Sequence, residues 1–411
     1  MTLEDALRVF AKRFPGDSPA RQPVHTVYGG AHLFKSDTPA KLGVLALKAL
    51  NEYGSDPFAF GRLLGIPGDL ADTVYRRVVA KLQREPVEDF RIDFEDGYGN
   101  RPDREEDGHA ASTALEVSTG MAAGTLSPFI GIRIKSFSLE LTRRAMRTLE
   151  IFVTALLESA GKLPPSFVIT LPKIQLPEQV TALADLLDTL EPRLGLTAGT
   201  LKFEFMIETT QTIPILTRIL DEARGRAVAA HFGTYDYTAS CNITAAHQRM
   251  DHPACDFARH MMQVAYAGTG LWLSDGATNV MPVGSAEVVH RAWRLHVDHI
   301  RNSLVNAFYQ GWDLHPAQLP TRYAAVYSFF LESLGPATER LRNFIAKAGQ
   351  ATLVGDVFDD AATGQGLLNY FLRALNCGAI TEDEALATGL TLDELRSRSF
   401  VKIMRGRRAA G

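Results

Sequence analysis

The chain contains little cysteine. Its 411 residues include only three, Cys241, Cys255 and Cys377, which are far apart and form no CxxC pair. An odd number of widely spaced cysteines argues against a disulfide framework and against a cysteine-based zinc site. This usage suits a reducing compartment, and we expect a cytoplasmic protein.

The chain also lacks a large excess of charge of one sign and lacks long hydrophobic runs. Its formal net charge is −4, which gives no electrostatic reason to expect nucleic acid or an anionic membrane as a partner. No apolar run approaches the roughly 20 residues of a membrane span. The opening "MTLEDALRVFAKRF" carries both charge signs and predicts a short amphipathic helix rather than a signal peptide.

A glycine-rich nucleotide loop is missing as well. "VYGGAH" (27–32) lacks the GxGxxG spacing, and "GIPGD" (65–69) follows no predicted strand. A doubly wound open sheet would place such a loop after an early strand. Its absence favours a barrel over an open sheet.

What the sequence does contain is a regular alternation of short β-rich runs with longer helical patterns, the rhythm of βαβ units. Stretches such as 139–161 and 178–194 have apolar residues at helical spacing. The predicted strands are 23–29, 89–96, 129–134, 166–172, 201–208, 227–233, 270–276 and 311–316. Eight such units predict an α/β fold, a (β/α)8 TIM barrel within residues 1–320.

Beyond residue 320 the pattern becomes mostly helical. Helices are predicted over 322–349, 364–378 and 381–400, with a polar, acidic loop at 350–363. We therefore expect a helical C-terminal extension over residues 321–411.

Polar residues close several of the predicted strands, and active sites of barrel enzymes lie at this C-terminal face. The residues are Asp93, Glu95 and Asp96 in "IDFEDG", Arg133 in "GIRIK", Lys173 in "LPK", Glu208 in "FMIE" and Asp236 in "GTYD". The face thus collects several carboxylates together with one or two cations.

Converging carboxylates repel one another unless protons or a cation neutralise them. Two carboxylates with open remaining positions suit Mg²⁺, with Mn²⁺ as the alternative ion, better than zinc, because histidine and cysteine are missing from the motif. An arginine across the site would grip a substrate carboxylate through two hydrogen bonds. Metal and arginine together describe a site that polarises the carbonyl of a carboxylate-bearing substrate and stabilises an enolate.

Each of these residues also has a purely structural explanation. Asp236 could cap the following helix, Arg133 could be a salt-bridge partner, and "IDFEDG" could be an acidic turn before a helix. The occurrence of all of them, in order, at four strand ends favours a functional site.

The ordered motifs resemble those of a known family. "RIDFEDGYG" is similar to the family's "DLEDAV" strand, "GIRIKS" to "VRIN", "VITLPKIQLPEQV" to "vvlPKve.peqv", "FMIETTQTI" to "miEta.gi" and "HFGTYDYTASCNI" to "fGxxDla". The family is the citrate lyase β-subunit and malyl-CoA lyase group, relatives of the metal-dependent pyruvate aldolases of the HpcH/HpaI type. The likeness covers roughly residues 23–320.

This resemblance implies a Mg²⁺-dependent TIM barrel with Glu208 and Asp236 as metal ligands and Arg133 as the carboxylate clamp. Gly233 and Thr234 would contact substrate. By the same resemblance, Asp93, Glu95, Asp96 and Lys173 would support the ligands and metal-bound waters. It also implies a homo-oligomer, a trimer or hexamer.

Two further residues follow from the resemblance as candidates for moving protons. In the CoA-thioester members a C-terminal segment supplies an aspartate, often to a neighbouring subunit; Asp359 in "GDVFDDAAT" matches it, with Asp360 as the alternative. His32, after the first strand, is a candidate general base, because the pyruvate-aldolase relatives use a histidine in this region.

The chain departs from the family where CoA is bound. The usual opening "vPGdr" is "VYGGAHLFKSDT" here, which puts CoA in doubt, although Lys35 and Lys41 could meet phosphates. We therefore expect a carbon–carbon lyase or aldolase that cleaves either a 4-hydroxy-2-oxo acid or a β-hydroxyacyl-CoA. The alternatives are a phosphoenolpyruvate-handling phosphotransferase on a related barrel and a barrel that only binds ligand.

Overall fold

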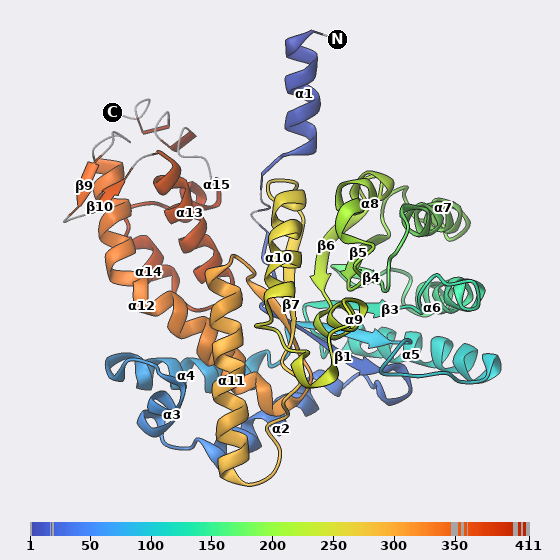
Figure 1. Ribbon diagram of the computed structural model, residues 1–411, viewed down its shortest axis with the longest axis horizontal. Coiled ribbons are helices and arrows are strands. Elements are labelled where there is room, and N and C mark those ends of the chain that lie inside the picture. The colour runs from blue at the N-terminus through green and yellow to red at the C-terminus, as the bar shows by residue number, and fades with distance from the viewer. Residues whose placement is uncertain are drawn as a thin grey trace.

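The computed structural model describes residues 2–16, 18, 20–346, 352–354, 357–359, 361–397, 402–403 and 406–407. Its centre is a closed barrel in which eight parallel strands pair in sequence order and β8 pairs back with β1 (Figure 1). The strands are β1 (His25–Gly30), β2 (Asp89–Asp93), β3 (Phe129–Arg133), β4 (Phe167–Leu171), β5 (Lys202–Ile207), β6 (Ala227–Phe232), β7 (Trp272–Ala277) and β8 (Gln310–Asp313). All eight predicted strands are confirmed, and so is the barrel.

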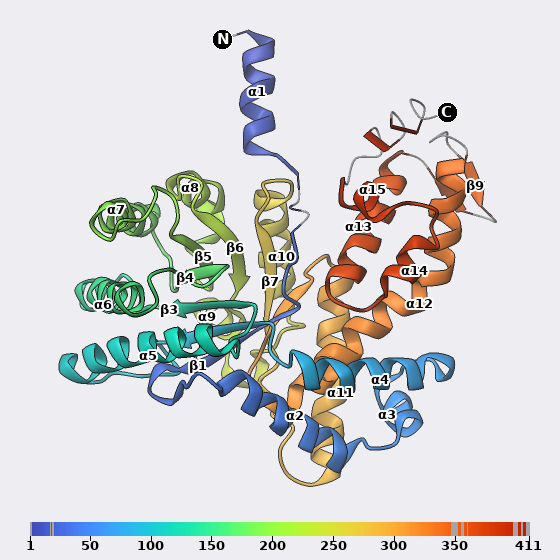
Figure 2. The same cartoon turned by 180° about the vertical axis from the view of Figure 1, so that it is seen from behind.

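Helices surround the barrel and link its strands (Figures 1 and 2). They are α2 (Thr38–Tyr53), α3 (Pro57–Leu64), α4 (Gly68–Arg84), α5 (Asp103–Ala123), α6 (Thr142–Ala160), α7 (Pro177–Arg193), α8 (Leu216–Glu222), α9 (Thr234–Ser240), α10 (Pro253–Tyr266) and α11 (Ala286–Val305), with single 3₁₀ turns at Ala31–Leu33, Ile213–Ile215, Ala245–His247 and Pro316–Gln318. The amphipathic helix α1 (Leu3–Arg13) precedes the barrel, as predicted.

The second strand is shorter than predicted because the side chain of its last residue turns the chain. Asp93 accepts hydrogen bonds from the backbone N–H of Glu95 (2.9 Å) and of Gly97 (2.7 Å). A carboxylate that binds its own following backbone offers the chain an alternative to the sheet ladder. Glu95 and Asp96 therefore lie in the loop after β2 rather than in the strand.

The C-terminal extension consists of helices, as predicted, but begins inside the barrel's own outer layer. It comprises α12 (Leu319–Ala346), α13 (Ala361–Asn376), α14 (Glu382–Leu386) and α15 (Leu392–Ser397). The first half of α12 is almost entirely buried, so α12 is also the helix that covers β8. The predicted domain boundary at residue 320 falls within its first turn and stays a prediction.

Two predictions for the extension are wrong. The acidic loop expected at 350–363 contains an antiparallel hairpin of β9 (Thr352–Val354) and β10 (Val357–Asp359), because its β-branched and aromatic residues favour strands. The helix expected at 381–400 is two helices. It is interrupted at Gly389, whose φ of +80° ends α14's turn and is open chiefly to glycine.

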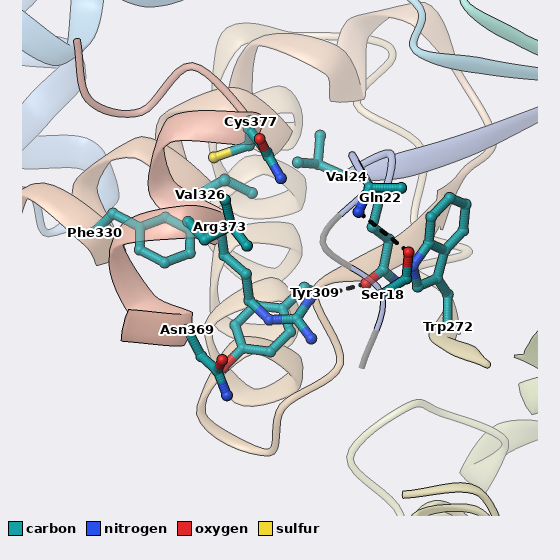
Figure 3. Close-up of a pocket in the computed structure, with 13 residues that line it drawn as sticks. Ser18, Gln22, Val24, Trp272, Tyr309, Val326, Phe330, Asn369, Arg373 and Cys377 are labelled. Atoms are coloured by element: carbon teal, nitrogen blue, oxygen red, sulfur yellow. Dashed lines mark hydrogen bonds between the residues drawn. The ribbon is translucent and has the colours of Figure 1, made fainter. Parts of the chain in front are cut away.

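The extension packs against the N-terminal rim of the barrel around one stacked arginine (Figure 3). The guanidinium carbon of Arg373 on α13 lies 4.0 Å from the ring centre of Tyr309, and its Nη1 donates to Gln22 Oε1 (3.0 Å). A small pocket lies between these residues, Trp272 and α12. It is on the face opposite the strand ends and contains none of the predicted site residues.

The lower half of the barrel interior is filled by charges rather than by aliphatic side chains. We call Asp89, Arg91, Glu204 and His231 the interior ion cluster; all four are buried. Arg91 donates from Nε and Nη2 to the two oxygens of Glu204 (2.8 and 2.9 Å) and also bonds Asp89. Threonines on β1 and β4 donate to the same carboxylates. Every carboxylate of this cluster therefore has a cationic partner.

No helix in the part of the chain that the structure describes is long and apolar enough to cross a membrane. This agrees with the absence of long hydrophobic runs in the sequence.

Candidate active site at the strand ends

The two predicted metal ligands come from adjacent strands. Glu208 follows β5 directly and is 2% exposed, and Asp236 lies in the first turn of α9, just after β6, on the exposed surface. Burial, together with the nearby charge of Asp236, raises the pKa of Glu208 to about 8. The protein thus holds a carboxylate pair that lacks enough positive charge to keep both members ionised.

Lys173, after β4, joins this pair to the loop after β2. Its backbone N–H donates to Glu208 Oε1 (2.7 Å), while its ammonium group bonds Glu95 and lies 2.9 Å from Asp96 Oδ2. To do both, it adopts a φ of +52°, a left-handed conformation that costs a non-glycine residue roughly 1 kcal/mol. The structure therefore brings Lys173, Glu95, Asp96 and Glu208 together, as predicted from their strand ends.

Arg133 is buried at the same face, but one edge of its guanidinium is already used. Its Nε and Nη2 donate to the two oxygens of Asp93 (2.7 and 2.5 Å), and its Nη1 lies 3.4 Å from Glu95 Oε2. The bidentate partner in this structure is thus Asp93. The predicted clamp role of Arg133 stays a prediction, and only the Nη1 edge faces a group other than Asp93.

Gly233 and Thr234 lie directly beside the carboxylate pair. A Cβ atom on Gly233 would come within 2.7 Å of Glu208 Oε2, so only glycine leaves that oxygen its room. The hydroxyl of Thr234 is buried and has no hydrogen-bond partner among the described residues. Gly233 thus leaves space beside the pair and Thr234 has a polar group without a partner among the described residues, while their contact with substrate stays a prediction.

His32, in the turn after β1, lies in an aromatic cluster at the same face. Its ring is 5.6 Å from that of Tyr98 and 6.4 Å from that of His109, and the Tyr98 hydroxyl pairs with His109 Nδ1 (2.7 Å). His32 Nδ1 is buried without a hydrogen-bond partner among the described residues. Burial, then the positive charge of Arg101, lowers the pKa of His32. A neutral imidazole is the form that accepts a proton.

Asp359 is not near these residues within one chain. It ends β10, where its backbone pairs with Thr352, and the hairpin lies at the far end of α12 from the strand ends (Figures 1 and 2). Asp360, the alternative, lies outside the described residues. One chain therefore does not bring this aspartate to Glu208.

Three residues at this site were not predicted. Lys135 is buried, donates to the backbone carbonyl of Phe94 (2.6 Å) and lies 2.9 Å from Glu106 Oε2, which fixes the loop after β2. Tyr28 and Trp312 stack on the Arg133 guanidinium, 4.7 and 5.5 Å from its carbon. Side chains alternate between the inside and the outside of the barrel along β1 and β8, and this alternation could have predicted that both aromatic residues point inward.

The donor set fits a magnesium ion with few protein ligands. Among the described residues no group of three or more His, Cys, Asp or Glu side chains forms a metal cage. Glu208 and Asp236 offer hard oxygen atoms and an excess of negative charge, and Mg²⁺ commonly takes one or two carboxylates and completes its shell with water and substrate oxygens.

The fold is shared with solved structures of low sequence identity. A citrate lyase from Burkholderia xenovorans LB400 has a TM-score of 0.61 at 20% identity, covering 91% of this chain and 98% of that one. CitE from Mycobacterium tuberculosis, in complex with magnesium, acetoacetate and coenzyme A, has a TM-score of 0.51 at 14% identity, covering 88% of this chain and 99% of that one. A malate synthase from Haloferax volcanii has a TM-score of 0.52 at 14% identity, covering 90% of this chain and 99% of that one.

These neighbours confirm the predicted resemblance to the citrate lyase β-subunit group at the level of fold. A search of curated protein sequences gives no match. The sequence model that does match spans residues 3–403, nearly the whole chain. By that match, the chain belongs to the family described as "Domain of unknown function (DUF6986)".

Proposed function

We propose that the protein is a Mg²⁺-dependent carbon–carbon lyase of the aldolase type that acts on a 2-oxo carboxylate, cleaving a 4-hydroxy-2-oxo acid to pyruvate and an aldehyde, or the reverse. The observation that carries this proposal is the Glu208–Asp236 pair. It is short of positive charge, as the raised pKa of Glu208 indicates, and it lies at the C-terminal face of the barrel.

In this proposal Glu208 and Asp236 hold the ion, and Gly233 leaves room for it. A bound Mg²⁺ would polarise a substrate carbonyl and offset the negative charge that develops on its oxygen. Lys173 fixes Glu208 through its backbone N–H and draws Glu95 and Asp96 toward the same point. These contacts orient the ligands before substrate arrives.

Recognition of the substrate carboxylate falls to Arg133 and Thr234. Arg133 would use Nη1, which lies 3.4 Å from Glu95 Oε2 in this structure, because Asp93 holds its other edge and Tyr28 and Trp312 hold its plane. The buried Thr234 hydroxyl supplies a second donor. A planar substrate carboxylate would be gripped by one guanidinium edge and one hydroxyl rather than by a full arginine fork.

In cleavage the 4-hydroxyl group loses its proton as the C3–C4 bond breaks, and His32 would return a proton to C3 to give pyruvate. In condensation His32 would accept the proton that leaves the pyruvate methyl group, and the aldehyde oxygen takes up a proton as the new bond forms. The lowered pKa of His32 and its Nδ1 without a partner support this role. Asp359 could contribute only from a neighbouring copy, since its own chain places it at the far end of α12.

A free 2-oxo acid is our first choice over a CoA thioester because the opening "VYGGAHLFKSDT" departs from the family's CoA-binding "vPGdr". Lys35 Nζ lies 3.2 Å from Glu116 Oε1, and Lys41 Nζ lies 2.9 Å from Asp37 Oδ1. Both lysines lie in solvent-exposed ion pairs, which add nothing in favour of CoA. For this reason we assign the CoA substrate as the alternative rather than the first choice.

The test is proton NMR in D₂O, following exchange of the methyl protons of pyruvate and, separately, of acetyl-CoA, with and without Mg²⁺. We expect metal-dependent exchange of pyruvate, lost in Glu208→Gln and in Asp236→Asn. The control is Glu222→Gln, which changes a glutamate at the end of α8 that bonds only Thr181 among the contacts shown.

Exchange of acetyl-CoA alone would shift the assignment to the thioester reaction and make Asp359 the next residue to test. If neither compound exchanges while the folded protein binds Mg²⁺, the lyase proposal fails and a binding-only barrel takes its place.

A further inference from the structure

Among the described residues, helix α1 contacts the rest of the chain at its C-terminal end, where Arg13 pairs with Asp221 of α8, and its apolar face is uncovered. It buries none of its residues and projects from the body of the protein beyond the end of α10 (Figures 1 and 2). Isolated helices of its length, 11 residues, are marginal in water even when well capped. Its apolar side chains are nevertheless arranged on one face, which calls for a surface to cover them.

The apolar face of α1 is a stripe of three residues, Leu3, Leu7 and Phe10, at a spacing of four and then three residues. Their exposed fractions are 76%, 57% and 60%. This is the spacing at which side chains share one face of a helix. Val9, 63% exposed, points to another side of the same helix.

Helix α10 has a stripe with the same spacing on its outer face. It consists of Phe257, Met261 and Val264, again four and then three residues apart. Phe257 is 57% and Val264 80% exposed, while Met261 is half-buried. In both stripes the spacing is four residues and then three, counted from the N-terminus. The side chains of the two stripes therefore face one another in the same order when the two helices run parallel.

Within one chain, the base of α1 already lies where the α10 stripe ends. Four residues beyond the last member of each stripe are Phe14 and Gly268. The Phe14 ring lies 3.8 Å from where a Cβ of Gly268 would be, and Gly16 N–H donates to Gly268 O (2.9 Å).

The same chain does not use this match, because the base of α1 is held in an outward direction. Arg13 Nη1 bonds Asp221 Oδ1 of α8 at 2.6 Å, and the Gly16–Gly268 hydrogen bond fixes the turn that follows. In a two-fold arrangement of copies that meet at this end, an outward α1 would run parallel to the partner's α10. That is the direction that the spacing requires.

We infer that α1 is an exchanged arm: the Leu3–Leu7–Phe10 stripe of one copy docks on the Phe257–Met261–Val264 stripe of a second copy, and the reverse. Such an interface is isologous, so each contact occurs twice. The occupant of the α10 stripe is a second copy of this chain.

The test is the particle mass of the full chain by light scattering after size-exclusion chromatography. Leu7→Asp and Val264→Asp should each halve the mass of the wild-type particle. The matched control Val9→Asp, on the same helix and equally exposed, should leave it unchanged. A wild-type monomer, or a particle whose mass neither variant changes, would overturn the proposal.

A cross-link separates exchange from folding back. With Cys241→Ser as background, Leu7→Cys combined with Met261→Cys should form a disulfide that doubles the mass on non-reducing gels. The control pair, Val9→Cys with Met261→Cys, should not. A disulfide that stays within one chain, or none at all, would contradict the exchange between copies.

Discussion

Two groups of charges occupy the same barrel at different depths, and they differ in how completely they are buried and paired. In the interior ion cluster, Arg91 contacts both Glu204 and Asp89, with His231 beside Glu204. At the strand ends, Arg133 is held by Asp93 and Lys173 by Glu95 and Asp96, and no cationic side chain of the described residues forms an ion pair with Glu208 or Asp236. The interior ion cluster fills the barrel with paired charges. We call Glu208 and Asp236 the strand-end pair, and an added cation would increase stability most there.

Removal of the central cation should show how much the interior ion cluster depends on pairing. Arg91→Met leaves Asp89 and Glu204 buried without their partner, and we expect a loss of about 3–5 kcal/mol in the free energy of unfolding. Urea denaturation followed by circular dichroism measures it. The double variant Arg91→Met with Glu204→Leu should recover much of the loss. A single variant as stable as the wild type would show that the pairing is unimportant.

Mg²⁺ should stabilise the protein by binding Glu208 and Asp236 at the strand ends, and it should not bind the interior ion cluster. At an ion concentration of 100 times Kd we expect about 2.7 kcal/mol of added stability, seen as a rise in Tm in differential scanning fluorimetry. The rise should vanish in Asp236→Asn, which removes one proposed ligand. Equal stabilisation of that variant would place the ion elsewhere.

Gly233→Ala should displace Glu208 by steric crowding, without changing any charge. The added methyl group would meet Glu208 Cβ at 2.5 Å and Oε2 at 2.7 Å, so Glu208 must move. We expect a loss of about 1–3 kcal/mol and weaker Mg²⁺ binding by isothermal titration calorimetry. Gly108→Ala, in α5, is the control because nothing lies within 4 Å of its added Cβ. A normal Mg²⁺ affinity in Gly233→Ala would count against Glu208 as a ligand.

Glu85, a carboxylate outside the barrel that is paired with Arg21 and Lys81, should show how pairing makes stability depend on pH. Burial opposes ionisation of Glu85, but Arg21 and Lys81 lower its pKa from 4.5 to about 2. Its contribution to stability is therefore complete above pH 4.5 and is lost as the pH falls toward 2. Glu85→Gln should cost about 1–2 kcal/mol at pH 7, since its side chain is 24% exposed, and the difference should shrink below pH 4.5. A constant difference across that window would contradict the pairing.

Glu208→Gln should have the smallest effect on stability. With a pKa of about 8, Glu208 is mostly protonated at pH 7, so the neutral amide replaces a neutral acid of nearly the same shape, and in metal-free buffer we expect a change within about 0.5 kcal/mol. Thermal unfolding in the presence of a chelator measures it. A loss as large as that of Arg91→Met would mean that the two clusters do not differ in the way described.

The sequence predicted the architecture well because strand periodicity and strand-end polarity are local signals. Glu208, Lys173 and the "IDFEDG" carboxylates could be assigned to one face without coordinates, since parallel strands end together. The sequence could not show that Asp93 takes one edge of Arg133, because that pairing depends on the register of β2 against β3. Nor could it show the interior ion cluster, whose members come from β2, β5 and β6 and follow no motif.

The extension was predicted less accurately for a related reason. The sequence around the strands at 352–354 and 357–359 contains acidic residues that are typical of a loop, and only the pairing of the two strands identifies them. The match between α1 and α10 depends on two helices that are more than 240 residues apart in the sequence and adjacent only in space.

Lys173 illustrates a conflict between backbone preference and side-chain need. A glycine or asparagine at this position would relax the left-handed turn and still offer its N–H to Glu208, but it would give up the ammonium group that draws Glu95 and Asp96 inward. Replacement of Lys173 therefore exchanges roughly 1 kcal/mol of backbone strain for the loss of its ion pairs with Glu95 and Asp96. One residue thus connects the loop after β2 to Glu208 at the cost of a strained backbone.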